Sequence, residues 1–245
     1  SCHVACKITG TPMVTTVHGR QPVHASRKKF HAMGDKALPV CEAIRDQLVS
    51  ELGVSEKQLE VSRNGIETDK FIRLEAPENE KPIISIIGRL TGPKGDLCYR
   101  LLDECLDTDS YDVKVISGSQ IESRFDKFRQ RVDFCGYTND IASVLATSDL
   151  VIGAGRVAME SLLCGRPTLA IGEAEAIGLV DNSNIKEAMA SNFGDIGPKD
   201  LDIDFSSIEQ QVKLGLQNKY CYKEVVDTIK ENYSLAKIVD QIEST

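Results

Sequence analysis

The sequence lacks an apolar stretch long enough to cross a bilayer, a secretory signal at its start and any excess of positive charge. A membrane-spanning helix needs about 20 consecutive apolar residues, so we do not expect an integral membrane protein. The net charge of -8 argues against a general nucleic-acid-binding surface. The hydrophobic content of 41% and the charged content of 27% are instead typical of a globular protein that folds in water.

The eight cysteines are scattered and include no C-x-x-C pair. Most lie in apolar strand or helix contexts, where a free cysteine packs as a small hydrophobic side chain. We therefore expect reduced thiols and a cytoplasmic protein, with a metal site at Cys2, His3 and Cys6 as the minor alternative. No Ser/His/Asp or Cys/His arrangement and no carboxylate metal triad stands out.

The most informative stretch that is present runs from residue 81 to residue 95, KPIISIIGRLTGPKG. Its isoleucine-rich run predicts a strand buried on both faces, which ends at Gly88. Arg89 and Lys94 then follow at the carboxyl end of that strand, where ligands bind in open α/β sheets. A guanidinium fork and an ammonium group both suit phosphate oxygens. We interpret this loop as half of a pyrophosphate clamp.

A second glycine-rich loop lies in DLVIGAGRVAME, residues 149–160. A strand enters, Gly153 and Gly155 turn the chain, and a helix leaves whose N-terminus presents free N–H groups and a partial positive charge. Arg156 and Glu160 lie one turn apart on the same face of that helix. A carboxylate at Glu160 suits the two hydroxyls of a ribose, and the competing interpretation is an exposed helix glutamate.

Two other nucleotide motifs fit this sequence poorly. The second loop formally matches the dinucleotide fingerprint G-x-G-x-x-A, with Glu173 20 residues after Gly153. That fingerprint normally follows the first strand of its domain, and it would leave the two cations of the first loop unexplained. The first loop fails as an ATP-binding Walker A motif, because a proline precedes Lys94 and Gly95 stands where Ser or Thr must bind magnesium.

Three further features are weaker candidates. His18 ends an apolar strand at a position that would face an interdomain cleft, although a purely structural histidine is as good an interpretation. Gly136 and Tyr137 follow another strand and would offer backbone groups and a ring to a base, although an ordinary turn explains them equally well. A basic cluster is interpreted first as a solvated helix face, and alternatively as contact with an anionic acceptor or a membrane surface; it comprises Arg20, Arg27, Lys28 and Lys29.

The second half alternates short apolar runs with helix-length segments, which predicts a parallel sheet with crossover helices. Strands are expected near 83–87, 112–117, 131–135, 149–152 and 167–171, and helices near 96–106, 120–129, 139–147, 157–165, 183–191, 207–217 and 222–243. In the first half, helices are expected at 1–9, 26–33 and 41–52, strands at 13–17, 36–40 and 59–62, and a short helix capped by Ser55 and Gln58. The charged, aperiodic segment 66–81 is expected to be an interdomain linker.

Several segments together resemble the GT-B-fold glycosyltransferases of family 4, also called group 1. The most specific are I-G-R-L at 87–90 with P-K-G at 93–95, similar to G-R-L-x-x-x-K-G, and M-E-S-L-L-C-G-R-P at 159–167, similar to L-E-A-M-A-C-G-x-P. Less specific are T-T-V-H-G at 15–19, similar to T-x-H-G, L-P-V-C-E-A-I-R-D-Q-L at 38–48, and V-S-R-N-G-I at 61–66.

The resemblance implies an α/β protein of GT-B type. We expect a partial N-terminal, acceptor-side α/β domain with the linker at 1–78 and a Rossmann-like, parallel-sheet donor-binding domain at 79–220. Helices at 221–245 are expected to cross back to the N-terminal domain. A complete N-terminal domain would need roughly another hundred residues before Ser1.

The resemblance also assigns roles to matching positions. Arg89 and Lys94 would hold the donor diphosphate and stabilise the charge that develops as it leaves, and His18 would approach the donor from the other domain. Glu160 would bind the ribose, and Tyr137 would lie near the base. The remaining donor-binding candidates are glycines and one arginine: Gly88, Gly136, Gly153, Gly155 and Arg156.

The implied activity is retaining transfer of a sugar from a nucleotide-diphosphate sugar, with UDP expected, to a saccharide or lipid-linked acceptor. The family resemblance implies no metal, no cofactor and no protein base, and no nucleic acid partner is expected. The location expected is the cytoplasm, with peripheral contact at the inner membrane face through the basic cluster.

One departure from the family pattern concerns the donor sugar. The family commonly carries E-x7-E, but Ile152 stands eight residues before Glu160, and the glycine loop replaces the usual first glutamate. Two alternatives to a transferase therefore stay open: a nucleotide-sugar epimerase of the same fold, and a non-catalytic nucleotide-sugar-binding module or truncated transferase.

Overall fold

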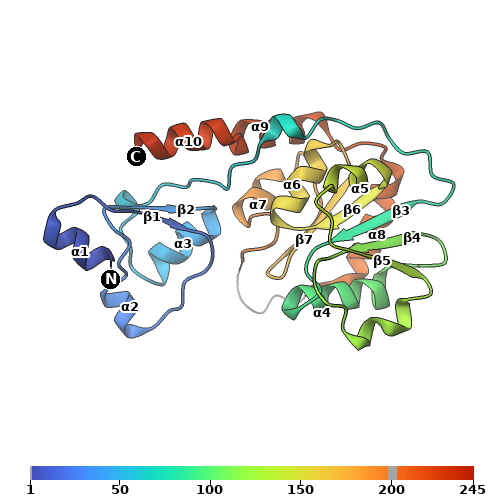
Figure 1. Ribbon diagram of the computed structural model, residues 1–245, viewed down its shortest axis with the longest axis horizontal. Coiled ribbons are helices and arrows are strands. Elements are labelled where there is room, and N and C mark those ends of the chain that lie inside the picture. Colours follow the sequence, from blue (N-terminus) through green and yellow to red (C-terminus); the bar gives the residue numbers. More distant parts are fainter. Residues whose placement is uncertain (1, 198–202) are drawn as a thin grey trace.

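The chain is described here by a computed structural model covering residues 2–197 and 203–245. Its strands form two separate sheets (Figure 1). The smaller sheet pairs β1 (Val14–Val17) in parallel with β2 (Lys36–Pro39). The larger sheet contains β3 (Ile83–Ile87), β4 (Asp112–Ile116), β5 (Val132–Gly136), β6 (Leu150–Gly153), β7 (Thr168–Ile171) and β8 (Ala176–Leu179).

The larger sheet has the strand order β5-β4-β3-β6-β7-β8. Pairing is parallel throughout except between β7 and β8, which are antiparallel. The predicted parallel sheet is therefore confirmed, whereas β8 was not expected because Gly178 interrupts its short apolar run. The chain leaves β3 in one direction towards β4 and later returns to β6 on its other side. Ligands bind outside the carboxyl ends of strands at such a switch point.

Helices cover both faces of this sheet (Figure 1). Ile84 and Ile86 of β3 pack in one cluster with residues of α4 (Gly92–Arg100) and α8 (Phe205–Gln217), while Ile87 packs in another with α5 (Ile141–Thr147). A third cluster joins α6 (Gly155–Leu163), α7 (Ile185–Ala190) and α9 (Lys223–Tyr233). Full burial of one isoleucine contributes about 2 kcal/mol, so this layered core supplies most of the stability.

Several expected helices differ from the structure at their ends. Residues Leu101–Cys105 continue α4 as a π-helix, and the helix expected at 120–129 is only a 3₁₀ segment, Ser123–Phe128. The helix expected at 222–243 breaks at Ser234 into α9 and α10 (Leu235–Ser244). Ile66 pairs with the backbone at this break. Its N–H donates to Tyr233 O (2.7 Å), and its carbonyl accepts from the Leu235 N–H (2.9 Å).

The N-terminal part consists of the small sheet with α1 (Cys2–Thr9), α2 (Ala25–Lys29) and α3 (Glu42–Ser50). The strand expected to be buried at 13–17 is mostly exposed; only Val17 is buried, because α3 and its neighbours cover one face of a two-stranded sheet. The helix expected to reach residue 33 stops at Lys29, and Ala32 has a left-handed φ of 54°.

Of the two short elements expected at 55–62, the helix is present as a 3₁₀ turn at Glu56–Gln58, but its predicted cap and the strand after it are not. Ser55 makes no side-chain cap bond; instead Gln58 Nε2 donates to Gly34 O (3.1 Å). Residues 59–62 form no strand beyond an isolated bridge between Ala37 and Leu59. A capping pattern alone therefore did not determine where these side chains bond.

The segment expected to be a linker lies against the C-terminal part. Phe71 and Leu74 pack on its clusters, and a 3₁₀ turn spans Thr68–Lys70. The fully buried Arg166 donates to Leu145 O (2.8 Å) and to the carbonyl of Glu75. At the other end of the chain, α10 runs back towards the N-terminal part (Figure 1), and Gln241 Nε2 donates to Val61 O (3.0 Å).

Candidate functional site

A hollow of about 560 Å³ lies between the N-terminal part and the carboxyl ends of the large sheet. We call it the interdomain cleft. His18 enters it from the end of β1, Arg89 and Lys94 from the β3–α4 loop, and Asp195 from the loop after α7. The structure thus brings together the two residues expected to hold the donor diphosphate and the histidine expected to approach the donor, although they are up to 76 positions apart in the sequence.

The β3–α4 loop presents its two cations differently. Arg89 is exposed and forms no ion pair with any residue in 2–197 or 203–245. Lys94 is 23% exposed, and its Nζ lies 2.7 Å from Asp195 Oδ1. Position 95 requires a glycine for a steric reason, because a Cβ there would lie 2.4 Å from Leu90 O. The glycine lets the first turn of α4 pack closely against the Leu90 carbonyl, while the Arg89 side chain is available to a ligand.

The β6–α6 loop provides the start of a helix beside these cations. Gly155 is the first residue of α6 and has a φ of 53°, which favours glycine. Ala154 occupies the N-cap and its side chain makes no capping hydrogen bond to the first N–H groups of α6. Gly153 and Ala154 line a smaller hollow of about 180 Å³ together with Arg89 and Lys94. The two loops therefore adjoin at the switch point.

Arg156 and Glu160 form an ion pair within α6. Arg156 Nε donates to Glu160 Oε1 at 2.6 Å, as expected for side chains four residues apart. Glu160 is only 6% exposed, so the competing interpretation as an exposed helix glutamate is wrong. Arg156 also lines a hollow of about 270 Å³ beside Asn64 and Gly65. Whether this carboxylate binds a ribose stays a prediction.

The other predicted residues occupy the expected strand ends. His18 is exposed, and its Nε2 lies 3.2 Å from Thr16 Oγ1. Gly136 ends β5, the edge strand two places from β3, and Tyr137 follows it. The Tyr137 ring is 75% exposed and lies beside Gly118. Gly88 leaves the sheet with its N–H donating to Ile116 O (3.1 Å). These positions permit the roles expected of them without testing those roles.

Two acidic residues of the cleft were not expected there. Asp195 belongs to a loop that no motif covers, and its only local signal is the turn-forming sequence N-F-G-D. Glu173 was considered only for a dinucleotide site, but it is exposed on the cleft just after β7. Ile152, in contrast, is buried within β6 and lines only the smaller hollow with an apolar side chain, so no carboxylate is presented from that position.

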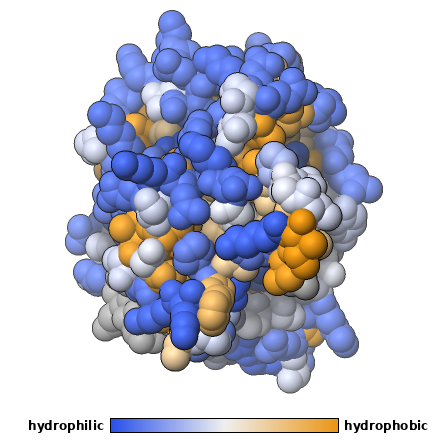
Figure 2. Space-filling model, turned by 90° about the vertical axis from the view of Figure 1, so that its left-hand side faces the viewer, coloured by the Kyte–Doolittle hydropathy of each residue, from blue (hydrophilic) through white to orange (hydrophobic). Residues whose placement is uncertain are grey.

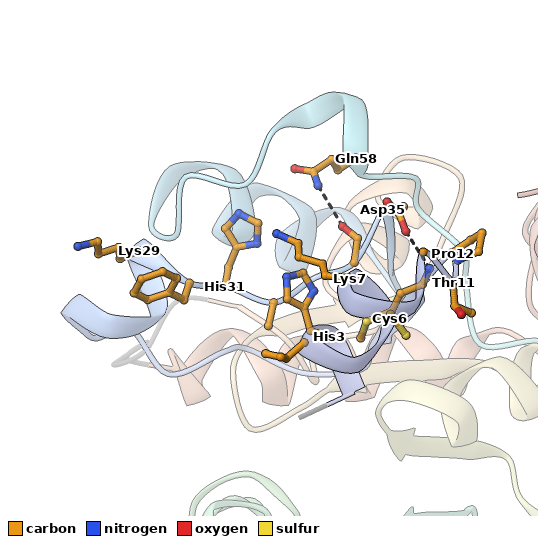
Figure 3. Close-up of a pocket in the computed structure, with 15 residues that line it drawn as sticks. His3, Cys6, Lys7, Thr11, Pro12, Lys29, His31, Asp35 and Gln58 are labelled. Atoms are coloured by element: carbon orange, nitrogen blue, oxygen red, sulfur yellow. Dashed lines mark hydrogen bonds between the residues drawn. The ribbon is translucent and has the colours of Figure 1, made fainter.

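A larger hollow of about 770 Å³ lies in the N-terminal part, away from both glycine loops. Figure 3 shows His3, Cys6, Lys7 and His31 around it. Among residues 2–197 and 203–245, no three His, Cys, Asp or Glu side chains come together to hold a metal ion, so the Cys2 site is not found. All eight cysteines are free thiols, as expected. This hollow contains none of the predicted phosphate-binding residues.

The basic cluster does not form a shared surface site. Arg20 pairs with Glu51, Arg27 Nη2 donates to Gln21 Oε1 (2.7 Å), and Lys29 lies 5.5 Å from the Phe30 ring. These contacts give no support to the expected membrane contact. Within the described part of the chain, no helix is long and apolar enough to span a membrane.

Comparison with known proteins supports the resemblance inferred from the motifs. Residues 1–70 match the profile of Glycosyltransferase Family 4. No curated protein sequence matches the chain significantly.

Solved structures match over almost the whole chain. A glycosyltransferase from Rickettsia africae ESF-5 is 20% identical with a TM-score of 0.72, covering 99% of this chain and 72% of that one. Anabaena Alr3699/HepE in complex with UDP is 16% identical with a TM-score of 0.69, covering 99% and 74%. The lipopolysaccharide outer core galactosyltransferase WaaB is 14% identical with a TM-score of 0.65, covering 99% and 70%. The chain therefore has the GT-B fold of these glycosyltransferases, and the family 4 resemblance is supported by the profile match over residues 1–70.

Proposed function

We propose that the chain is a glycosyltransferase that moves a sugar from a UDP-sugar to a saccharide or lipid-linked acceptor with retention of the anomeric configuration. The observation that carries this proposal is the meeting of Arg89, Lys94 and His18 in one cleft at the β3–β6 switch point. The Anabaena relative was solved with UDP, and again with UDP and glucose, which favours this donor class.

The two cations would bind the diphosphate and stabilise it as it leaves. A hydrogen bond to a charged group contributes about 1.5–3 kcal/mol, and the same contacts strengthen as negative charge develops on the leaving oxygen. The first turn of α6 adds N–H groups to this site. His18 would complete it from the N-terminal part.

The reaction itself needs few protein groups. The bond between the anomeric carbon and the phosphate oxygen breaks, and its electron pair leaves with UDP. An acceptor hydroxyl forms the new bond on the same face, and its proton passes to the departing phosphate. This scheme requires no protein base and no metal, as the family resemblance implies. Glu160 would accept hydrogen bonds from ribose hydroxyls through its second carboxylate oxygen, and Tyr137 would lie near the base.

A two-stage experiment tests this function. A thermal-shift screen of UDP-, GDP- and ADP-hexoses first identifies the donor, since a ligand in large excess over its Kd stabilises the native state measurably. Products are then analysed with and without simple glycoside acceptors. We expect UDP release and a new glycoside only when an acceptor is present, with the anomeric configuration retained.

Other outcomes distinguish the alternatives. Nucleotide binding without any turnover would identify a non-catalytic binding module. A changed sugar stereocentre in the absence of acceptor would identify an epimerase. Stabilisation by NADH in place of the nucleotide sugars would favour the dinucleotide interpretation of Gly153 and Glu173.

A further inference from the structure

The loop after α7 contains three consecutive residues with a left-handed backbone. The φ angles are 51° at Asn192, 55° at Phe193 and 85° at Gly194. Such angles are uncommon for residues with a side chain, and a bulky residue is an outlier there. Strain of this kind persists only where the surrounding structure over-determines it, and it clusters at functional sites. We call residues 192–194 the left-handed turn.

Contacts on two sides hold the left-handed turn in place. The Phe193 side chain is fully buried, and its ring centroid lies 6.1 Å from that of Tyr233 in α9. The carbonyl of Gly194 accepts hydrogen bonds from two backbone N–H groups that follow β7, at 3.1 and 3.0 Å. A Cβ on Gly172 would lie 2.1 Å from that same carbonyl oxygen, so the two backbones cross in close contact. The surrounding structure therefore holds the turn in this conformation.

The left-handed turn fixes the position of Asp195. Ile196, the next residue, is buried in the core of the N-terminal part with residues of α3. Asp195 Oδ1 lies 2.7 Å from Lys94 Nζ, and Oδ2 would lie 2.5 Å from a Cβ on Gly155. Its carboxylate thus stands in the cleft between the lysine and the first residue of α6.

The cleft is consequently lined by two chemically different sets of side chains. Arg20, Arg89 and Lys94 are cationic, whereas Asp195, Glu173 and Asn192 offer carboxylates and an amide, and the two sets meet at the Asp195–Lys94 ion pair. A nucleoside-diphosphate sugar has the same two chemistries side by side, an anionic diphosphate and a neutral polyol. Carboxylates repel phosphate but accept hydrogen bonds from hydroxyls.

We propose that Asp195 is a specificity-determining residue whose carboxylate accepts hydrogen bonds from the hydroxyls of the donor sugar, while Lys94 holds the adjacent phosphate. This inference rests on the proposed function. On this proposal the left-handed turn places a carboxylate from a distant loop in the cleft, where the buried Ile152 provides none.

Calorimetry with paired ligands tests this role. The probes are UDP, GDP or ADP and the matching hexose conjugate that stabilises the wild type most. In Asp195→Asn, the free nucleoside diphosphate should bind at least as tightly as to the wild type, because a nearby negative charge is lost. The ratio of the two dissociation constants, nucleotide over nucleotide sugar, should fall about tenfold, the size of one lost charged hydrogen bond. Glu173→Gln removes a carboxylate charge from the same cleft lining but breaks no ion pair. It is the matched control and should change the ratio less.

Each other outcome overturns one claim. An unchanged ratio in Asp195→Asn contradicts the sugar contact. Equal weakening of both ligands shows that Asp195 only positions Lys94, which also contradicts it. Asp195→Ser, which has a shorter and uncharged side chain, should lower the ratio at least as much as Asp195→Asn. Failure of every nucleotide to bind the wild type would instead remove the proposed function itself.

Discussion

The central strands of the large sheet and strand β1 of the small sheet are buried to very different extents. Every residue of β6 and β7 is buried, whereas in β1 only Val17 is. Five large apolar side chains of the first 30 residues are exposed: Val4, Ile8, Val14, Val23 and Phe30. Figure 2, which views the molecule from that end, shows separate apolar patches on a mainly hydrophilic surface.

The difference shows where the stability resides. A six-stranded sheet covered on both faces forms a core of its own, while a two-stranded sheet is marginal without further packing. The N-terminal part obtains some of that packing from the other part of the chain. Ile196 joins its core, and Arg63 Nη1 donates to Met189 O (3.2 Å). The interdomain cleft lies at this same boundary.

The largest effect is expected from Arg166→Ala in the well-packed part. The guanidinium is fully buried, and burial lowers the pKa of Arg166. Its loss removes one donor from each of the carbonyls of Leu145 and Glu75 and creates a cavity, which should cost roughly 3 kcal/mol of unfolding free energy. Urea unfolding measures this.

Arg45→Ala in the N-terminal part is the matched control. Arg45 forms an exposed pair with Asp46, so its loss should change the free energy of unfolding by no more than about 0.5 kcal/mol. Equal effects of the two substitutions would show that the two parts do not differ in the way described.

Cysteine chemistry sharpens the comparison at a smaller scale. Burial raises the pKa of Cys98 to about 12 and that of Cys164 to about 11, from an ordinary value of 9.0. In the native protein at pH 8, Ellman's reagent should modify the exposed Cys2 quickly and leave both buried thiols unmodified.

The same thiols give a pH dependence of stability. Because their native pKa is raised, their stabilising contribution is complete below pH 9 and is lost as the pH rises towards 11–12, when unfolded thiols ionise and native thiols do not. Urea midpoints that stay constant between pH 9 and 11 would contradict the burial of these groups.

The sequence predicted the large sheet well because each central strand is a continuous apolar run between turn residues. The boundaries expected for β3 match the structure, and the two cations that follow it reach a cleft as their position at a strand end suggested. Local pattern also predicted α6 and its Arg156–Glu160 spacing. These features depend on residues that are close in sequence.

Features that depend on distant contacts were missed. The break at Ser234 follows from the bridge to Ile66, and the exposure of β1 follows from its having one partner strand. Asp195 reaches Lys94 only because the left-handed turn is held by Tyr233 and by the backbone after β7. The sequence of the loop alone does not predict these contacts.

Titration calorimetry of UDP against Arg89→Ala and Lys94→Ala tests the central claim most directly. Each substitution should weaken binding by roughly 1–3 kcal/mol, the range for a lost charged hydrogen bond, while Lys213→Ala, which removes an exposed charge on α8, should leave binding unchanged. Unchanged affinity in both cleft variants would show that these cations do not bind the diphosphate.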